Sequence, residues 1–229
     1  MIHLEMIEDM LALQQRLNDD TNGKGWEEGT ASNGKLISWK RCIYMECAEL
    51  MDSFSWKHRK SVNAKTDKVN AQVEIADIWH FMLSLVLERA YPNSSIKEVA
   101  KDITSISGFN DFCLDAYDMS EYNIYEIMND IEIIIHDTSG FGFQIHDLLT
   151  NYFRLSLKCG INLYTLYKIY IGKNVLNKFR QDNGYQDGSY LKNWNGREDN
   201  TILNEILDSG VLKEDEIYKE LTKNYAKVK

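Results

Sequence analysis

Two pairs of acidic residues lie inside apolar helical segments, and they restrict the folds that this chain can adopt. The first pair is Glu46 and Glu49 and the second is Glu74 and Asp77, each flanked by residues such as Ile, Leu, Met and Trp. Both pairs have i, i+3 spacing, which places their side chains on one helical face, about 5–6 Å apart at Cβ. Like charges this close destabilise each other, and burying an unpaired carboxylate is costly or forces it to protonate.

The distance along the chain between the two pairs suggests how they meet. With 24 residues between Glu49 and Glu74, a helix–loop–helix folds back antiparallel, so that the four carboxylates converge. A cation between them would relieve the repulsion, and oxygen ligands alone suit Mg²⁺ or Mn²⁺. A single acid pair at this spacing is also common on solvated helices. The apolar neighbours of both pairs favour the metal site.

The pattern of apolar residues predicts an all-α fold. The 229 residues include one proline, and apolar residues recur with the 3.6-residue period of a helix. A Ser-x-x-Glu capping box predicts a new helix at Ser95. We expect one catalytic domain over residues 1–229, with a helical insertion at 95–140 and a C-terminal extension at 200–229. The other expected helices span about 2–19, 35–56, 67–91, 124–135, 143–158 and 161–181, with two short ones after 200.

Composition limits the partners and the compartment. The net charge of −9 argues against broad binding to nucleic acid. No stretch approaches the ~20 apolar residues of a membrane span, and the N-terminus lacks a signal-peptide core. We therefore expect a cytoplasmic protein without a membrane partner. The four cysteines show no C-x-x-C spacing, which predicts buried, reduced thiols and disfavours zinc.

A segment near the C-terminus has the composition of a phosphate site. Lys173, Asn177 and Arg180 share one helical face at i, i+4 and i+7, and they offer two cations and an amide. The following loop carries Tyr185 and Lys192, which are expected to close over phosphates. Spacing alone is equally compatible with an ordinary solvated helix followed by a turn.

Two further segments have side chains suited to a nucleotide. Gln14 and Asn18 are one helical turn apart, and two amides there can read the donor–acceptor edge of a pyrimidine. Trp56 and Lys57 offer a flat ring beside a positive charge. The alternatives are exposed helix amides in the first segment and a helix end with a favourable cation in the second.

Residues near the second acid pair leave two roles open. His80 lies three positions after Asp77 and is followed by Phe81. It can be a metal ligand, line a base pocket, or be an ordinary core histidine. A carboxylate site with several Mg²⁺ ions supports phosphoryl or nucleotidyl chemistry. Glu46 is our first choice for the carboxylate that activates water, although any of the four acids could act.

Together these segments resemble the dimeric dUTPases, a branch of the all-α nucleoside triphosphate pyrophosphatases that includes MazG-like proteins. The E-x-x-E and E-x-x-D motifs mark the superfamily. The run K-N-x-L-N-x-F-R-Q followed by G-Y-x-x-G-x-Y-x-K-x-W is more specific to the dUTPase branch. The resemblance covers residues 1–91 and 143–194. The His58-Arg59 pair departs from the aromatic residues expected after Trp56-Lys57.

The resemblance implies a multi-helix bundle that forms a homodimer and hydrolyses dUTP, and also dUDP, to dUMP. It implies two or more Mg²⁺ ions held by Glu46, Glu49, Glu74 and Asp77, with water attacking a phosphorus beyond the α position. Trp56 is expected to act across the dimer interface. The implied substrate-binding residues are Gln14, Asn18, Trp56, Lys57, His80, Phe81, Lys173, Asn177, Arg180, Tyr185 and Lys192.

Three other functions are compatible with parts of this pattern. A MazG-like pyrophosphatase of other or broader specificity would share the acids but lack the run after Lys173. A di-iron carboxylate bundle usually supplies two Glu-x-x-His motifs, whereas this chain offers Asp77-x-x-His80. A non-catalytic helical interaction protein would place the acids on a solvated face, which their apolar neighbours disfavour.

Overall fold

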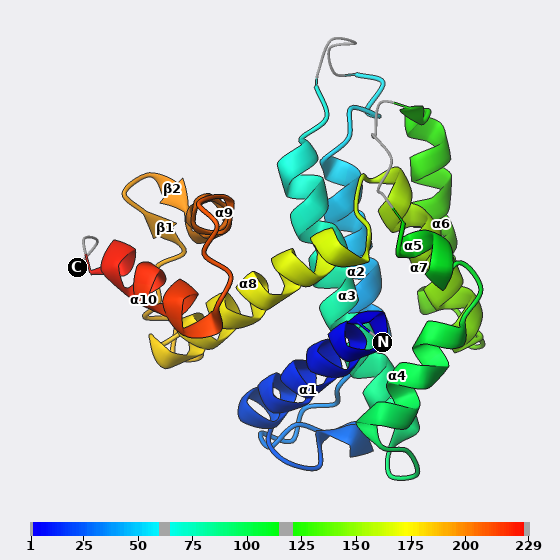
Figure 1. Ribbon diagram of the computed structural model, residues 1–229, viewed down its shortest axis with the longest axis horizontal. Helices are drawn as coiled ribbons and strands as arrows, with labels where there is room; N and C mark the ends of the chain where they lie inside the picture. The colour runs from blue at the N-terminus through cyan, green and yellow to red at the C-terminus, as the bar shows by residue number, and fades with distance from the viewer. Residues whose placement is uncertain (1, 60–64, 115–120, 227–229) are drawn as a thin grey trace. The chain divides into compact units, whose positions relative to one another are not determined.

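The computed structural model describes residues 2–59, 65–114 and 121–226, and α-helices account for most of them (Figure 1). The chain forms two compact units, Met1–Leu166 and Tyr167–Lys229. Within the described residues the β-structure amounts to one two-stranded hairpin and one isolated bridge. The predicted all-α fold class is therefore confirmed.

The first unit contains seven helices in the described residues, and an eighth begins at its end. The elements are α1 (Ile2–Asn22), the 3₁₀ turn η1 (Trp26–Glu28), α2 (Trp39–Asp52), α3 (Lys68–Ala90), α4 (Ile96–Ser105), α5 (Phe109–Phe112), α6 (Ile124–Ser139), α7 (Ile145–Lys158) and the start of α8 (Leu163–Asp182). The second unit contains the rest of α8, β1 (Asn193–Trp194), β2 (Arg197–Glu198), α9 (Asp199–Asp208) and α10 (Glu214–Tyr225).

Side-chain caps explain where several helices begin. The Ser38 side chain accepts a hydrogen bond from the Arg41 amide at the start of α2, and Asp67 does the same for Asn70 at the start of α3. Such caps satisfy amides that have no partner inside the helix. The capping box predicted at Ser95 is present at the start of α4. The helix expected over 35–56 is shorter, because its cap lies at Ser38 and it ends at Asp52.

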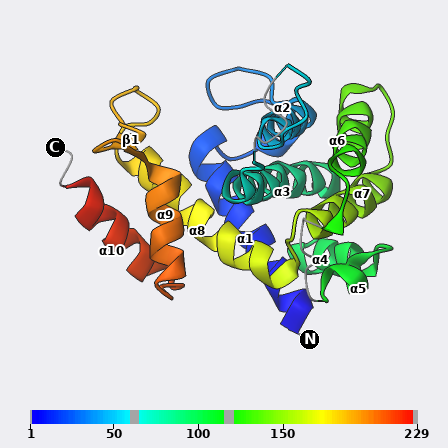
Figure 2. The same cartoon turned by 90° about the horizontal axis from the view of Figure 1, so that it is seen from above.

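Helices α2 and α3 lie side by side and run antiparallel (Figures 1 and 2). Two hydrogen bonds tie the end of α2 to the start of α3: the Asp67 amide donates to the Ser53 carbonyl at 2.8 Å, and the Asn70 amide side chain donates to Ser53 Oγ at 2.8 Å. The pairing brings the two acid-bearing segments of the sequence together, as the spacing of the acids predicted.

Helix α3 is the centre of the core of the first unit. Most of its side chains are buried, which a helix that is apolar on nearly all sides requires. Trp79 stacks on Tyr152 of α7, with ring centroids 5.0 Å apart. The Tyr152 hydroxyl donates to the Ile75 carbonyl at 3.0 Å. These contacts fix the rotation of α3 and therefore the direction in which its polar residues point.

The second unit is built around a cluster of aromatic rings. Phe179 of α8 contacts Trp194 and Tyr225 edge-to-face or nearly so, and Tyr190 stacks on Tyr225. Trp194 lies in the β-hairpin, whose two-residue turn is Asn195-Gly196, both with positive φ. An Asn-Gly turn of this kind matches the twist of the two strands. The second strand of the hairpin ends at Glu198, and α9 begins at the next residue.

Other sequence predictions are resolved by the same structure. The segment 95–140 contains α4, α5 and α6, and the tail after 200 contains most of α9 and all of α10. All four cysteines are free: Cys47 and Cys159 are buried, whereas Cys42 and Cys113 are partly exposed. Among the described residues, none of the helices combines the length and the hydropathy that crossing a bilayer requires.

Candidate active site

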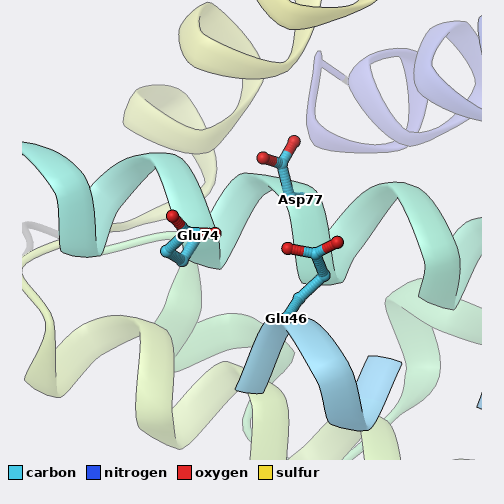
Figure 3. A group of neighbouring side chains, drawn as sticks. All are labelled: Glu46, Glu74 and Asp77. Carbon is cyan, nitrogen blue, oxygen red and sulfur yellow. The ribbon is translucent and has the colours of Figure 1, made fainter. Parts of the chain in front are cut away.

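Three of the four predicted carboxylates converge between α2 and α3. Glu46 extends from α2 toward Glu74 and Asp77 of α3 (Figure 3), and one carboxylate oxygen of each lies within 4.8 Å of the others. Glu74 is buried, with 8 % of its surface exposed. Glu49 is exposed and is not a member of this group of three, although its charge is felt at Glu46. We call Glu46, Glu74 and Asp77 the acid cluster.

The acid cluster is electrostatically unfavourable as it stands. Burial raises the pKa of Glu46 to about 8, and the charges of Asp77, Glu49 and Glu74 and a hydrogen bond with Glu74 add to the shift. A carboxylic acid with such a pKa holds a proton at neutral pH unless a cation replaces it. The repulsion anticipated from sequence is therefore present in the folded chain.

The donor set of the acid cluster fits a hard divalent cation. Its three ligand atoms are carboxylate oxygens, without a histidine or a cysteine among them. Mg²⁺ and Mn²⁺ prefer such oxygen ligands, and bound waters complete their coordination. A divalent cation would also replace the proton that burial imposes on Glu46. The exposed Glu49, one turn further along α2, is placed to extend the negative charge toward solvent.

The raised pKa of Glu46 predicts how stability changes with pH in EDTA. The folded chain holds a proton that the unfolded chain releases above its ordinary glutamate pKa, so the free energy of unfolding should fall as the pH rises from 5 to 8. Mg²⁺ should stabilise the protein increasingly over the same range, since it displaces that proton. Denaturant unfolding at several pH values tests this. In Glu46→Gln the free energy of unfolding should fall less over this pH range. An equal fall in the wild type and in the variant would contradict the raised pKa of Glu46.

The predicted base-reading amides form a buried hydrogen-bonded network with α3. Gln14 and Asn18 of α1 are each 3 % exposed. Gln14 Nε2 donates to Asn18 Oδ1 at 3.0 Å and to Ser84 Oγ at 3.0 Å, and Asn18 Nδ2 donates to Ser84 Oγ at 2.9 Å. His80 Nδ1 lies 2.8 Å from Gln14 Oε1. We call these four residues the amide network.

Ser84 is a member of the amide network that sequence reasoning missed. The available signal was its position: Ser84 is a polar residue in an apolar helix, one turn after His80 and two turns after Asp77. This spacing places it near the same face of α3 as the acid cluster. The rise between Asp77 and Ser84 is about 10 Å. The same helix therefore carries the Asp77 carboxylate and, two turns later, the Ser84 hydroxyl that binds the amides.

An aromatic ring contacts Phe81, which follows His80 on α3. Phe81 is roughly parallel to Trp39, with ring centroids 6.1 Å apart, and Trp39 meets Trp26 edge-to-face at 5.6 Å. The indole of Trp26 donates to Asp19 at 3.1 Å, which ties the 3₁₀ turn to α1. Flat apolar rings next to hydrogen-bonding amides are the usual surroundings of a bound base.

Trp56 and Lys57 lie just beyond α2. Trp56 is 37 % exposed, and the ammonium of Lys57 lies 5.6 Å from its ring centroid. Lys57 also pairs with Asp52 at 2.5 Å, at the end of α2. The predicted combination of an accessible ring and a local positive charge is therefore present.

The predicted phosphate-binding residues of α8 lie together within the second unit. Arg180 donates to Asn177 Oδ1 at 3.1 Å, and Lys173 donates to Asn200 Oδ1 at 3.1 Å. Arg180 also forms a bidentate pair with Asp199, with Nε–Oδ2 and Nη2–Oδ1 distances of 2.9 Å each. Sequence reasoning missed Asp199 and Asn200, which follow the β-hairpin and begin α9.

Asp199 organises the surroundings of Arg180. It is 1 % exposed and accepts a hydrogen bond from the Tyr190 hydroxyl at 2.8 Å. Burial alone would raise its pKa, but the hydrogen bonds and charge of Arg180 outweigh burial and hold the pKa below its usual value. In the adjoining loop the Lys192 ammonium lies 5.5 Å from the Tyr185 ring. The cationic side chains are thus held by defined partners.

The arrangement of His80 disfavours the di-iron alternative. A di-iron bundle usually supplies histidines that join the carboxylates as ligands. Here His80 is hydrogen-bonded to Gln14 and is not a member of the acid cluster. His80 therefore has the geometry of a residue that supports the amide network.

Comparison with known protein families places most of the chain in one family. The dUTPase family model matches residues 6–185, a range that contains every predicted site residue except Lys192. It also contains the segment 95–140, for which the sequence predicts an insertion. The search of curated proteins finds no significant match. Because the family model covers most of the 229 residues, the chain belongs to the dUTPase family of all-helical enzymes and is a dUTP diphosphatase.

Proposed function

We propose that the chain converts dUTP, and also dUDP, to dUMP in a Mg²⁺-dependent hydrolysis centred on the acid cluster. The proposal rests on one observation: one carboxylate oxygen each of Glu46, Glu74 and Asp77 lies within 4.8 Å of the other two. In this environment the pKa of Glu46 is raised to about 8. A phosphate chain brings further negative charge, so such a site suits it only when cations are bound.

The acid cluster and Glu49 would hold two or more Mg²⁺ ions. Mg²⁺ bound there would lower the pKa of a water and stabilise the charge on the leaving phosphate. Glu46 is the acid that we assign to orienting that water, because burial and the neighbouring carboxylates raise its pKa and so favour its accepting a proton. Attack of water on a phosphorus beyond the α position would leave dUMP as the nucleotide product.

The amide network would bind uracil, with Phe81 against the base. Gln14 and Asn18 supply amide groups and His80 holds Gln14 in place. The rise of about 10 Å along α3 from Asp77 to Ser84 is compatible with a nucleotide that extends from its phosphates to its base. A base bound at one end and phosphates at the other would then be aligned by a single rigid helix.

The phosphate chain would be bound by the predicted residues of α8, which are Lys173, Asn177 and Arg180. Arg180 and Lys173 carry the charge, and Asn177 is hydrogen-bonded to Arg180. Arginine suits phosphate because it is always charged and has five N–H donors, more than Arg180 uses for Asp199 and Asn177. Lys192 and Tyr185 of the following loop complete the set.

We further infer that the enzyme acts as a homodimer in the cytoplasm. Trp56 supports the dimer, because it is an accessible aromatic ring beside Lys57 at the end of the helix that carries Glu46. Large aromatic rings are enriched in protein interfaces. Trp56 and Lys57 would then contribute to the site across the interface.

A nucleotide panel tests the proposed function. We expect Mg²⁺-dependent release of pyrophosphate from dUTP and of phosphate from dUDP, both abolished by EDTA and restored by added Mg²⁺. The substrates dTTP, dCTP and UTP should react much more slowly. Equal turnover of dCTP or UTP would indicate the broader specificity of a MazG-like pyrophosphatase. Full activity in EDTA would contradict the metal site.

A further inference from the structure

We propose that Ser84 sets the preference for uracil over cytosine by fixing the orientation of the Gln14 and Asn18 amides. This inference rests on the proposed role of those amides in reading the base. Ser84 is fully buried in α3, and its Oγ is shared by three hydrogen bonds. It would act as a positioning residue, since it contacts the amides that read the base.

The direction of each bond follows from the single proton of the hydroxyl. Ser84 Oγ donates that proton to the His80 carbonyl, one turn earlier in α3, at 2.9 Å. Its oxygen can therefore only accept from Gln14 and Asn18, at 3.0 and 2.9 Å. Both amides must turn their NH₂ groups toward Ser84, because a carbonyl oxygen there would face another acceptor.

Without Ser84, the hydrogen bonds among Gln14, Asn18 and His80 could run in either of two opposite directions. In the observed one, His80 donates to Gln14 Oε1 and Gln14 Nε2 donates to Asn18 Oδ1. If both amides rotated by 180° and His80 moved its proton from Nδ1, every bond between these residues would reverse and none would be lost. Ser84 removes this ambiguity, because it accepts in one arrangement and opposes two acceptors in the other.

The two arrangements would recognise different bases. The observed bonds use one N–H and one carbonyl lone pair of Asn18, which leaves a second donor and a second acceptor for a ligand. Uracil presents the O4 acceptor beside the N3–H donor, whereas cytosine presents the N4–H₂ donor beside the N3 acceptor. For a base held in one pose by its sugar and phosphates, the observed order of donor and acceptor suits one of these edges, and the reversed order suits the other.

The inference makes a selective prediction about substrates. Thymine has the same O4 and N3–H edge as uracil, so the orientation of Asn18 cannot distinguish them. Loss of the Ser84 hydroxyl should therefore raise the kcat/KM for dCTP relative to dUTP by about tenfold, the magnitude of one to two hydrogen bonds. The ratio of dTTP to dUTP should stay within about twofold of its original value. A general loosening of the site would raise both ratios.

The experiment compares variants of the full-length enzyme in Mg²⁺. Ser84→Ala removes the acceptor, and Ser84→Cys keeps the volume with a poorly accepting sulfur. Ser84→Thr should keep the preference for dUTP, since the threonine hydroxyl can donate to the same His80 carbonyl. Ser156→Ala is the matched control: Ser156 is also fully buried and donates to the carbonyl one turn earlier, at 2.8 Å in α7. Ratios between substrates do not depend on the fraction of folded enzyme.

The outcomes separate this inference from the proposed function. A raised dCTP:dUTP ratio in Ser84→Ala or Ser84→Cys, with an unchanged dTTP:dUTP ratio, supports the role of Ser84. An unchanged dCTP:dUTP ratio in both variants overturns it. Asn18→Ala tests the base site itself: unaltered kcat/KM for dUTP in that variant would overturn the proposed base-reading role, whatever Ser84 does.

Discussion

Replacing Glu74 by glutamine is expected to reduce the kcat/KM for dUTP by about 100-fold or more while making the metal-free protein more stable. The two effects have opposite signs because the charges that bind the cation repel each other, and so destabilise the folded chain, when no cation is bound. Glu74 is buried and contributes both a charge and a hydrogen bond to the raised pKa of Glu46. Neutralising it removes a ligand from the metal and a repulsive charge from the folded chain.

Steady-state kinetics and thermal unfolding, each with Mg²⁺ and with EDTA, measure the two effects. Glu88→Gln is the matched control, because Glu88 lies on the same helix and burial also raises its pKa, but it is not a member of the acid cluster. The control should keep its activity and its stabilisation by Mg²⁺. A Glu74→Gln enzyme with wild-type activity would show that the acid cluster is not the catalytic metal site.

Replacing Asp199 by alanine should be the most damaging change in the second unit. The variant leaves Arg180, whose side chain is 12 % exposed, without its bidentate partner, and it removes the acceptor of the Tyr190 hydroxyl. Breaking a buried ion pair by removing one partner costs about 3–5 kcal/mol. Amides in residues 167–226 should therefore exchange with solvent at least about 100-fold faster, which hydrogen-exchange mass spectrometry measures.

The control for this prediction is another aspartate of the same unit. Asp208 is exposed and pairs with Lys168 at 3.4 Å, so Asp208→Ala should change exchange little. The kcat/KM for dUTP should fall in the Asp199 variant as well, because Arg180 loses the bonds that orient its guanidinium. Exchange rates in 167–226 that match the wild type would contradict the structural importance of the Arg180–Asp199 pair.

Local sequence patterns predict this structure best. The i, i+3 spacing of Glu74 and Asp77 is a property of any helix, and the capping box at Ser95 needs four consecutive residues. Such features follow from backbone geometry and survive in any fold. They identified the acid cluster and most of the helices. The ends of α2 were less certain, since they depend on which polar side chain caps the helix.

The partners of the site residues were beyond the reach of the sequence. Ser84 lies 66 and 70 positions from the two amides that it holds, and Asp199 lies 19 positions from Arg180. No helical period relates residues that far apart. A lone serine in an apolar helix and an aspartate after a hairpin are each unremarkable until the backbone brings a donor to them.

The sequence by itself determined that this protein is helical, that two acid pairs share a hairpin, and that its motifs are those of a dUTPase. The tertiary structure decided which acids meet, since Glu46 joins Glu74 and Asp77 while Glu49 faces solvent. It also decided the orientation of Gln14 and Asn18 through Ser84. The physical reason is that helical periodicity fixes the face on which a residue lies, whereas the packing of one helix on another fixes what that face contacts.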